Sequence, residues 1–146
     1  MRENWNYRRG DIYLADLGEN NGSEQGGIRP VVVLQNNVGN RFAPTLIVAA
    51  VTSRTWKKKE QPTHALIEGI RNLTCPSIVL GEQLKTINKS SVLKYIGKVP
   101  PEQMWAVDWA LMVSIALGRR RVMEVFARLE KEGLYADIDD CKHEKC

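Results

Sequence analysis

The sequence predicts a mainly β fold with helices, namely a small, strongly curved β-barrel followed by C-terminal helices. Two observations predict this fold. Seven short segments rich in β-branched residues follow one another at close spacing over residues 11–99, separated by glycine, proline and asparagine. One long apolar helical pattern then begins at Pro100-Pro101. The length of 146 residues, 43% of them hydrophobic, suits one core.

The first half of the chain predicts three strands and a long loop. The first strand is expected at Asp11–Leu17, where apolar and polar residues alternate. The next segment, GENNGSEQGG, holds four glycines and two asparagines in ten residues, so we expect a flexible loop of functional length. The run PVVVLQ from Pro30 predicts the second strand, which ends at a turn-rich NNVGN. Thr45–Thr52 predicts the third.

The second half predicts a polar, basic loop over residues 53–63 and four further short strands. We expect these at His64–Ile67, Ser77–Leu80, Leu84–Ile87 and Leu93–Val99, with Gly81 separating two of them. The helix from Pro100-Pro101-Glu102 carries two adjacent apolar stripes, and we therefore expect it to be mostly buried or shared with a partner subunit. The stripes are Met104, Val107, Leu111, Ile115 and Trp105, Trp109, Met112, Ala116. A second helix is expected from about Arg120 to Lys131.

The charge distribution separates the chain into two parts. Residues 1–118 are predicted to form a single domain that includes its C-terminal helix, and 119–146 a helical extension with a frayed tail. The extension carries seven basic and seven acidic side chains, so the whole net charge of +4 lies on the body, which permits a nucleic-acid partner. No apolar run approaches the roughly 20 residues of a membrane span, and the first residues lack the apolar core of a signal peptide. Cytoplasm is the predicted compartment.

The cysteines predict neither disulfides nor a metal site. Cys75, Cys141 and Cys146 have no CxxC spacing, and a chain of this size folds without disulfides. Cys141-x-His143-x-x-Cys146 supplies three potential ligands where zinc requires four. The phosphate-binding, hydrolase and metalloprotease signatures are also absent from the sequence, so we expect no cofactor and no metal.

Candidate chemistry gathers at the end of the glycine-rich loop and at the end of the third strand. Arg29 follows Gly26-Gly27-Ile28 and precedes Pro30, whose ring restricts the backbone of the preceding residue. Flexible backbone beside a planar, permanently charged guanidinium suits a phosphate, although a surface arginine near a turn is the alternative. The third strand ends at Thr52-Ser53-Arg54.

A basic loop with an embedded tryptophan follows Thr52. Basic side chains track a nucleic-acid backbone while an aromatic ring stacks on a base, so the loop predicts binding of a single strand; an ordinary solvated loop is the alternative. Its residues are Arg54, Trp56, Lys57, Lys58 and Lys59.

The chain has only two histidines, His64 and His143. A ribonuclease mechanism that uses two histidines as acid and base is therefore not readily assembled from one copy. His64 is the rival catalytic base, but in the strand HALI we interpret it as structural. We interpret the stripe of Trp105 and Trp109 as core or dimer interface rather than a ligand site.

Five ordered segments carry a resemblance to a known family. GDIYLADL, GSEQGGIRPVVVLQN, NRFAPTLIVAAVT, PTHALI and GEQLKTI resemble the MazF/PemK family of bacterial toxin endoribonucleases, in the branch typical of Gram-positive bacteria. The similarity covers roughly residues 9–117. It implies a small SH3-like barrel of the CcdB/PemK type, usually a homodimer, which cleaves single-stranded RNA at short sequences without a metal. It also implies a cognate, MazE-like antitoxin whose peptide occupies the RNA groove.

The resemblance assigns roles to individual residues. The family's two principal catalytic residues fall on Arg29 and Thr52, and its substrate loop on Ser23, Glu24, Gln25, Gly26 and Gly27. Gln83 matches a glutamine associated with RNA binding, and Lys85 stands where this branch commonly has arginine, which keeps the charge but loses bidentate hydrogen bonding. With the basic loop considered above, Ser53, Arg54 and Lys57 complete the expected RNA-binding set. The segment from Gly118 onward extends beyond the usual family end.

The expected reaction is attack by the 2′-hydroxyl of RNA on the adjacent phosphorus, which leaves a 2′,3′-cyclic phosphate and a 5′-hydroxyl. We expect Arg29 to act mainly by electrostatic stabilisation, and Thr52 to add a neutral hydrogen bond. Two alternatives come from other classes: a non-catalytic toxin on the same barrel that poisons DNA gyrase, and a plain SH3-like interaction module. The presence of both Arg29 and Thr52 favours the ribonuclease, because neither alternative needs that pair.

Overall fold

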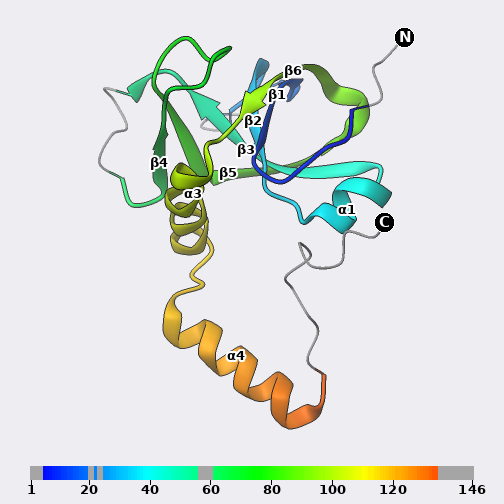
Figure 1. The fold of residues 1–146 in the computed structure, drawn as a ribbon, viewed down its shortest axis with the longest axis vertical. Coiled ribbons are helices and arrows are strands. Elements are labelled where there is room, and N and C mark those ends of the chain that lie inside the picture. The colour runs from blue at the N-terminus through cyan, green and yellow to red at the C-terminus, as the bar shows by residue number, and fades with distance from the viewer. Residues whose placement is uncertain (1–4, 20–21, 23–24, 56–60, 135–146) are drawn as a thin grey trace.

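The computed structural model describes residues 5–19, 22, 25–55 and 61–134. They form an antiparallel sheet followed in the chain by two longer helices (Figure 1). The six strands lie in the order β4-β5-β3-β2-β1-β6. The mainly β fold predicted from the sequence is confirmed. The strands are β1 (Asp11–Asp16), β2 (Ile28–Val33), β3 (Thr45–Thr52), β4 (His64–Ile67), β5 (Ser77–Asn88) and β6 (Val92–Lys98), and the helices are α1 (Asn37–Phe42), the short 3-10 turn η1 (Lys89–Ser91), α3 (Pro101–Ser114) and α4 (Arg119–Glu132).

Two expectations about local structure are wrong. The turn-rich segment after β2 forms α1, because the side chain of Asn36 caps the helix by accepting a hydrogen bond of 2.8 Å from the backbone N–H of Gly39. The two strands expected on either side of Gly81 are one strand, β5. A Cβ at Gly81 would lie 2.7 Å from the carbonyl oxygen of Thr63 and 2.9 Å from that of Ala110. The glycine therefore allows close approach of neighbouring backbone rather than ending the strand.

The sheet buries side chains on both faces, since successive residues of a strand point to opposite sides. On β2, Val32 belongs to a cluster with β4 and α3, whereas Val31 and Val33 belong to a second cluster. This second cluster also contains Tyr13 and packs against Trp5 and Tyr7 of the N-terminal segment. Alternation along β2 therefore puts Arg29, two residues before Val31, on the same face of the sheet as Val31 and Val33.

α3 packs on the first cluster through only part of its surface. Val107 and Ala110 are buried, and Arg9 forms an ion pair of 2.7 Å with Asp108. Trp105 and Trp109, however, are 70% and 58% exposed. The expectation that this helix is mostly buried is therefore wrong for the described chain, and the interpretation of its tryptophans as core is wrong with it. The expectation that the stripe is shared with a partner subunit stays a prediction.

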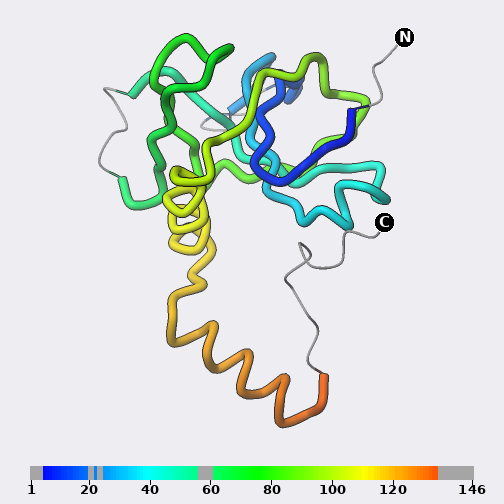
Figure 2. Tube along the Cα trace, viewed as in Figure 1, coloured from blue at the N-terminus to red at the C-terminus, as the bar shows by residue number. Residues whose placement is uncertain are grey.

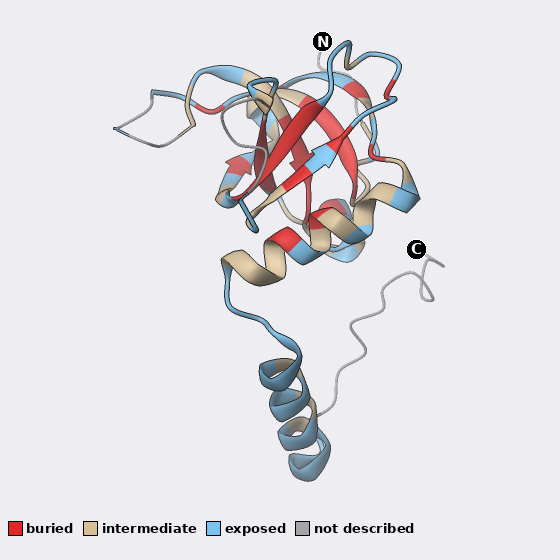
Figure 3. Ribbon diagram, turned by 90° about the vertical axis from the view of Figure 1, so that its left-hand side faces the viewer, coloured by how far each residue is buried: buried red, intermediate tan, exposed pale blue. Residues whose placement is uncertain are grey.

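α4 projects away from the sheet beyond the end of α3 (Figures 1 and 2). It begins at Arg119 and ends at Gly133, which adopts the left-handed conformation typical of a helix C-cap. No residue of α4 is buried, in contrast to the red, buried strands of the sheet (Figure 3). Within the described residues, no helix has the length and apolar character needed to cross a bilayer. The tail from residue 135, with Cys141, His143 and Cys146, lies outside the described residues.

Candidate active site

Arg29 and Thr52 each lie two residues beyond the last β2–β3 pair, Val31–Ala50, at the same end of the two strands. β2 and β3 pair antiparallel with Val31 opposite Ala50 and Val32 opposite Ala49. Continuing this register by two residues places Arg29 opposite Thr52 at the end of the pair. Directly opposite residues of two antiparallel strands project on the same face, here the face that also carries Val31 and Ala50. Two residues 23 positions apart in the sequence thereby share one site.

The glycine-rich loop begins and ends next to this pair. Its two ends are joined by backbone hydrogen bonds, from Leu17 N–H to Gly27 O (2.9 Å) and from Gly27 N–H to Gly18 O (2.6 Å). Gly27 has φ +73°, a conformation that residues with a Cβ rarely adopt. The glycine at position 27 therefore lets the chain turn back into β2 two residues before Arg29.

The guanidinium of Arg29 is held by the loop. Its Nε–H donates to the carbonyl oxygen of Gly26 at 2.9 Å, and Nη1 donates to the side-chain oxygen of Gln25. Neither of these described bonds uses the Nη2 amino group, so donors remain for a ligand. Burial, with the positive charge of Arg54 nearby, lowers the pKa of Arg29 from its ordinary value. Arg29 nevertheless stays a cation at neutral pH.

The hydroxyl of Thr52 is oriented by the backbone that follows it. Its Oγ1 accepts a hydrogen bond of 3.2 Å from the backbone N–H of Arg54. Because a hydroxyl has one hydrogen and two acceptor lone pairs, this contact leaves its O–H available to donate. Arg54 itself is exposed, as is Ser53. The end of β3 thus presents the neutral hydroxyl donor of Thr52 beside the cationic side chain of Arg54.

β5 contributes two further predicted residues on the same face. Lys85 lies opposite Val48 in the β3–β5 register, and Val48 belongs to the second cluster, as Val31 does. The ammonium of Lys85 donates to the carbonyl oxygen of Leu17 at 2.8 Å. Two residues earlier on the strand, Gln83 accepts a hydrogen bond of 3.3 Å from the backbone N–H of Gln25. Both side chains therefore contact the ends of the glycine-rich loop.

The remaining predicted residues are placed as follows. Gln25 and Gly26 are half-buried in the loop. Ser23, Glu24 and Lys57 lie outside the described residues, as do Trp56, Lys58 and Lys59 of the basic loop. The structure thus gathers six of the predicted residues around the ends of the glycine-rich loop, namely Gln25, Gly26, Gly27, Arg29, Gln83 and Lys85. Thr52 and Arg54 lie at the end of β3, and the charge of Arg54 is near enough to lower the pKa of Arg29.

His64 contacts a residue that the sequence analysis did not single out. Its Nε2 lies 2.7 Å from Glu82 Oε1, and its side chain is only 2% exposed. Burial opposes ionisation of Glu82, but the hydrogen bonds that its carboxylate accepts, from His64 first, lower its pKa overall. Glu82 sits in GEQLKTI beside Gln83, and its pairing with His64 depends on the β4–β5 alignment, which has no local signal in sequence.

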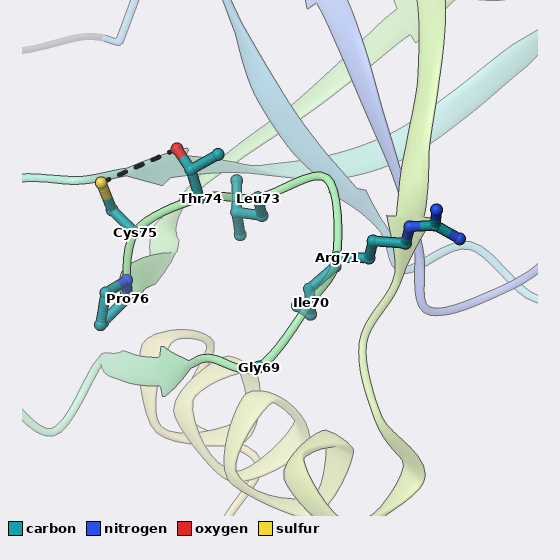
Figure 4. A pocket seen from close by; sticks show the side chains of 7 residues that line it. All are labelled: Gly69, Ile70, Arg71, Leu73, Thr74, Cys75 and Pro76. Atoms are coloured by element: carbon teal, nitrogen blue, oxygen red, sulfur yellow. Dashed lines mark hydrogen bonds between the residues drawn. The ribbon is translucent and has the colours of Figure 1, made fainter.

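A shallow pocket of about 280 Å³ lies in the loop between β4 and β5 (Figure 4). It is lined by Gly69, Ile70, Arg71, Leu73, Thr74, Cys75 and Pro76, and the side chain of Arg71 points away from it. None of the predicted site residues lines it. Across the part of the chain that the structure describes, no three His, Cys, Asp or Glu side chains are grouped as metal ligands.

Comparison with known proteins decides the family. Residues 8–115 match the family model described as PemK-like, MazF-like toxin of type II toxin-antitoxin system. The chain belongs to this family. It is 49% identical over 111 residues to Endoribonuclease EndoA of Bacillus subtilis, covering 75% of this chain and 95% of that protein.

Solved structures of MazF-like toxins share the fold. An endoribonuclease from a mycobacterial species, in complex with its cognate antitoxin, superposes with a TM-score of 0.64 at 25% identity, over 77% of this chain and 97% of that one. MazF of Deinococcus radiodurans gives a TM-score of 0.66 at 21% identity, over 77% and 99% of the two chains. α4 lies beyond the residues that the family model matches.

Proposed function

We propose that the protein is the toxin of a type II toxin-antitoxin module and acts as a sequence-specific, metal-independent endoribonuclease on single-stranded mRNA. One observation carries the proposal. The β2–β3 register, extended two residues beyond its last pair Val31–Ala50, sets Arg29 beside Thr52 near the ends of the glycine-rich loop, and the charge of Arg54 lies close enough to Arg29 to lower its pKa. A cationic fork and a hydroxyl donor at one place are what a phosphodiester needs when its negative charge increases. Family membership and the EndoA relative support the same activity.

The proposed reaction is an internal transfer within RNA. The 2′-oxygen loses its proton and bonds to phosphorus, while the bond from phosphorus to the 5′-oxygen breaks and that oxygen gains a proton. The products are a 2′,3′-cyclic phosphate and a 5′-hydroxyl. Arg29 offers its Nη2 donors to the phosphate oxygens, and Thr52 donates its hydroxyl hydrogen. Both bonds strengthen as charge accumulates on the phosphate, which is the requirement for catalysis.

Arg29 acts mainly by electrostatics in this proposal. Burial and the nearby charge of Arg54 lower the pKa of Arg29, yet an arginine guanidinium remains charged near neutrality. His64 is not assigned a proton-transfer role, because its ring is almost wholly buried and already bonded to Glu82. A His64→Ala variant that kept its fold and lost all cleavage would contradict this assignment.

We place the RNA around the same strand end. The proposed RNA-binding residues are Ser23, Glu24, Gln25, Gly26, Gly27, Ser53, Arg54, Lys57, Gln83 and Lys85. Arg54 is an exposed cation next to Thr52, and Gln83 and Lys85 hold the loop that borders the pair. Ser23 and Glu24 are included on the resemblance alone, and Lys57 on its place in the basic, tryptophan-containing sequence after Thr52.

The proposal extends to partners and place. A MazE-like antitoxin peptide would cover the RNA groove, a pairing supported by the solved mycobacterial complex of toxin with cognate antitoxin. We infer a homodimer, because the exposed Trp105 and Trp109 on α3 form an apolar stripe that a second copy can bury. The cytoplasm is the proposed compartment, since the substrate is mRNA. The gyrase-poisoning alternative is not favoured by the family match.

The deciding experiment is digestion of a mixed RNA pool with EDTA present, followed by mapping of the new 5′ ends. Wild-type protein is expected to produce 5′-hydroxyl ends at a short recurring sequence. Arg29→Ala should abolish these 5′ ends. Arg29→Lys should leave little activity, because an ammonium cannot make the bidentate hydrogen bonds of a guanidinium. The exposed Arg71→Lys serves as the matched control. Absence of wild-type cleavage, or the same cleavage by Arg29→Ala, would refute the proposal; near-normal turnover by Arg29→Lys would refute the bidentate contact.

A further inference from the structure

The charge order along α4 is opposite to the order that an isolated helix favours. Its first turn holds Arg119, Arg120 and Arg121 and no acidic residue, and its N-cap Gly118 offers no side-chain hydrogen bond. Its last turn holds two acids, Glu130 and Glu132, and one base, Lys131. Helix dipoles favour acids at the N-terminus and bases at the C-terminus, so this arrangement weakens the helix at both ends. The two ion pairs of Glu124 with Arg120 and Arg121, both exposed, offset little of this cost.

The charges also have a definite position around the helix. At 100° per residue, Val122, Val125 and Leu129 share one stripe, with Phe126 at the spacing that continues it. Arg119 and Glu130 lie along one flank of this stripe, and Arg121 and Glu132 along the other. Arg120 and Lys131 project on the far side. Each flank therefore begins with a positive residue and ends with a negative one.

We propose that α4 packs antiparallel against α4 of a second copy of this chain. In an antiparallel pair, equivalent flanks face each other with their ends exchanged. Arg119 then meets Glu130 of the partner subunit, and Arg121 meets Glu132 of the partner subunit. Val122 lies against Leu129 of the partner subunit, and the arrangement is two-fold symmetric. The N-terminus of each helix also lies beside the C-terminus of the other, which offsets the unfavourable dipole.

Charge selects this occupant and this direction. A parallel pair would set Arg119 and Arg121 beside the same residues of the second copy, and Glu130 and Glu132 likewise, so like charges would repel at both ends. In an antiparallel pair, every arginine on a flank faces a glutamate of the second copy, so no other molecule is needed to pair these charges. Arg128, which already forms an ion pair of 3.0 Å with Glu132, adds one more cation near the negative end.

Two helices of this length are too short to hold a complex together alone. The pairing therefore rests on the homodimer proposed above, whose bodies would hold the two copies of α4 at high effective concentration. α4 lies outside the residues matched by the family model, so this contact is an addition to what the matched region supplies.

Disulfide trapping tests the direction of packing. In a full-length chain with Cys75, Cys141 and Cys146 changed to serine, Val122→Cys and Leu129→Cys are introduced together. Residues seven apart on one helix are about 10.5 Å apart, too far to bridge within a chain. Oxidation is expected to link Cys at position 122 of one copy to Cys at position 129 of the other, as identified by mass spectrometry of the linked peptides. Links between equal positions would show parallel packing and overturn the proposal.

Charge reversal tests the cause. Arg119→Glu with Arg121→Glu makes both flanks wholly acidic, and Glu130→Arg with Glu132→Arg makes them wholly basic. Each double variant is expected to lower the crosslinking rate about tenfold, the equivalent of about 1.4 kcal/mol. The quadruple exchange should restore it, because it reverses every contact at once. Arg120→Glu, on the far side, is the matched control and should change little.

Light scattering on the same samples separates the possible failures. A dimer that gives no link between positions 122 and 129 overturns the α4 pairing and leaves the homodimer intact, whereas a monomer refutes both. Linking that is indifferent to all charge reversals, or that appears only after residues 135–146 are removed, also overturns the proposal; the second result would assign the stripe to the chain's own C-terminal segment.

Discussion

The contact that Lys85 makes in the structure indicates how this residue could support RNA binding. Its ammonium lies 2.8 Å from the carbonyl oxygen of Leu17, at the point where β1 passes into the glycine-rich loop. At the other end of the loop, Gln83 holds the backbone N–H of Gln25, and Gln25 in turn accepts from Arg29. A chain of contacts thus runs from β5 through the loop to the guanidinium. We propose that Lys85 supports RNA binding by positioning the loop through its contact with Leu17.

Replacing Lys85 by methionine tests this positioning. Loss of a hydrogen bond from a charged donor costs about 1.5–3 kcal/mol, so we expect kcat/KM for RNA cleavage to fall roughly tenfold or more. Hydrogen exchange at the amides of Leu17 and Gly27 should also accelerate in the absence of RNA. Lys85→Arg should recover part of both effects, and Lys94→Met, an exposed lysine on β6, should alter neither. Unchanged exchange with reduced cleavage would show that Lys85 contacts RNA directly.

The sequence allowed the site residues to be predicted, but not most of the contacts between them. The place of Arg29 between a glycine-rich loop and proline made it a candidate but favoured an ordinary surface arginine, and only the resemblance assigned catalytic roles to Arg29 and Thr52. Their common position at one end of β2 and β3 follows from extending the β2–β3 register two residues past Val31–Ala50, which can be done once the two strands are known. The contact of Lys85 with Leu17 joins residues 68 positions apart, and that of His64 with Glu82 depends on β4–β5 pairing. No local pattern encodes either.

Among the elements, β5 shows why a local rule failed. Glycine in a strand pattern was interpreted as a break at position 81, yet β5 runs through it from Ser77 to Asn88. The reason lies in tertiary structure, because backbone of α3 and of residue 63 approaches too closely for any side chain. The opposite error occurred at α1, where a local cap was present but the segment was interpreted as a turn. Strand positions that depended on alternation and β-branching were largely correct.

Gly81→Ala tests the close approach between β5 and α3. The added Cβ would lie 2.8 Å from Ser114 Oγ as well as within 3 Å of two carbonyl oxygens, so backbone must move. Overpacking of this kind costs about 1–3 kcal/mol, and we expect the upper end of that range in urea unfolding. Gly118→Ala, where the new methyl meets open space, is the control and should cost less than about 1 kcal/mol. Equal losses in the two variants would show that β5 and α3 tolerate separation.

The pairing of Glu82 with His64 predicts a pH dependence at the junction of β4 and β5. The pKa of Glu82 is lowered in the folded state, so its carboxylate stabilises the fold above its ordinary pKa of 4.5. This contribution is lost as pH falls through the lower, folded-state pKa. Glu82→Gln should therefore be less stable than wild type in urea at pH 7, and the difference should shrink below pH 4.5. Glu19→Gln, in the exposed loop after β1, is the control; a difference that is constant with pH would contradict the assignment.

At the scale of the whole molecule, we propose a division near residue 118. The body, residues 1–118, carries the net charge of +4 and the proposed active site, whereas residues 119–146 are neutral overall. α4 contributes no buried residue to the body, although it carries three consecutive arginines at its start. Those arginines have two possible uses, contact with RNA or contact with protein. Their alignment with Glu130 and Glu132 along the flanks favours protein.

The salt dependence of RNA binding separates these two uses. Each phosphate neutralised on a single strand contributes a slope of about −0.7 to the plot of log K against log salt. Arg54 is an exposed cation whose positive charge helps lower the pKa of Arg29. We expect it to neutralise one phosphate, so Arg54→Gln should reduce the magnitude of the slope by about 0.7. Arg120→Gln removes the same charge from α4 and should leave the slope unchanged. A catalytically inactive Arg29→Ala background prevents cleavage during titration, and a reduced slope for Arg120→Gln would make α4 part of the RNA-binding surface.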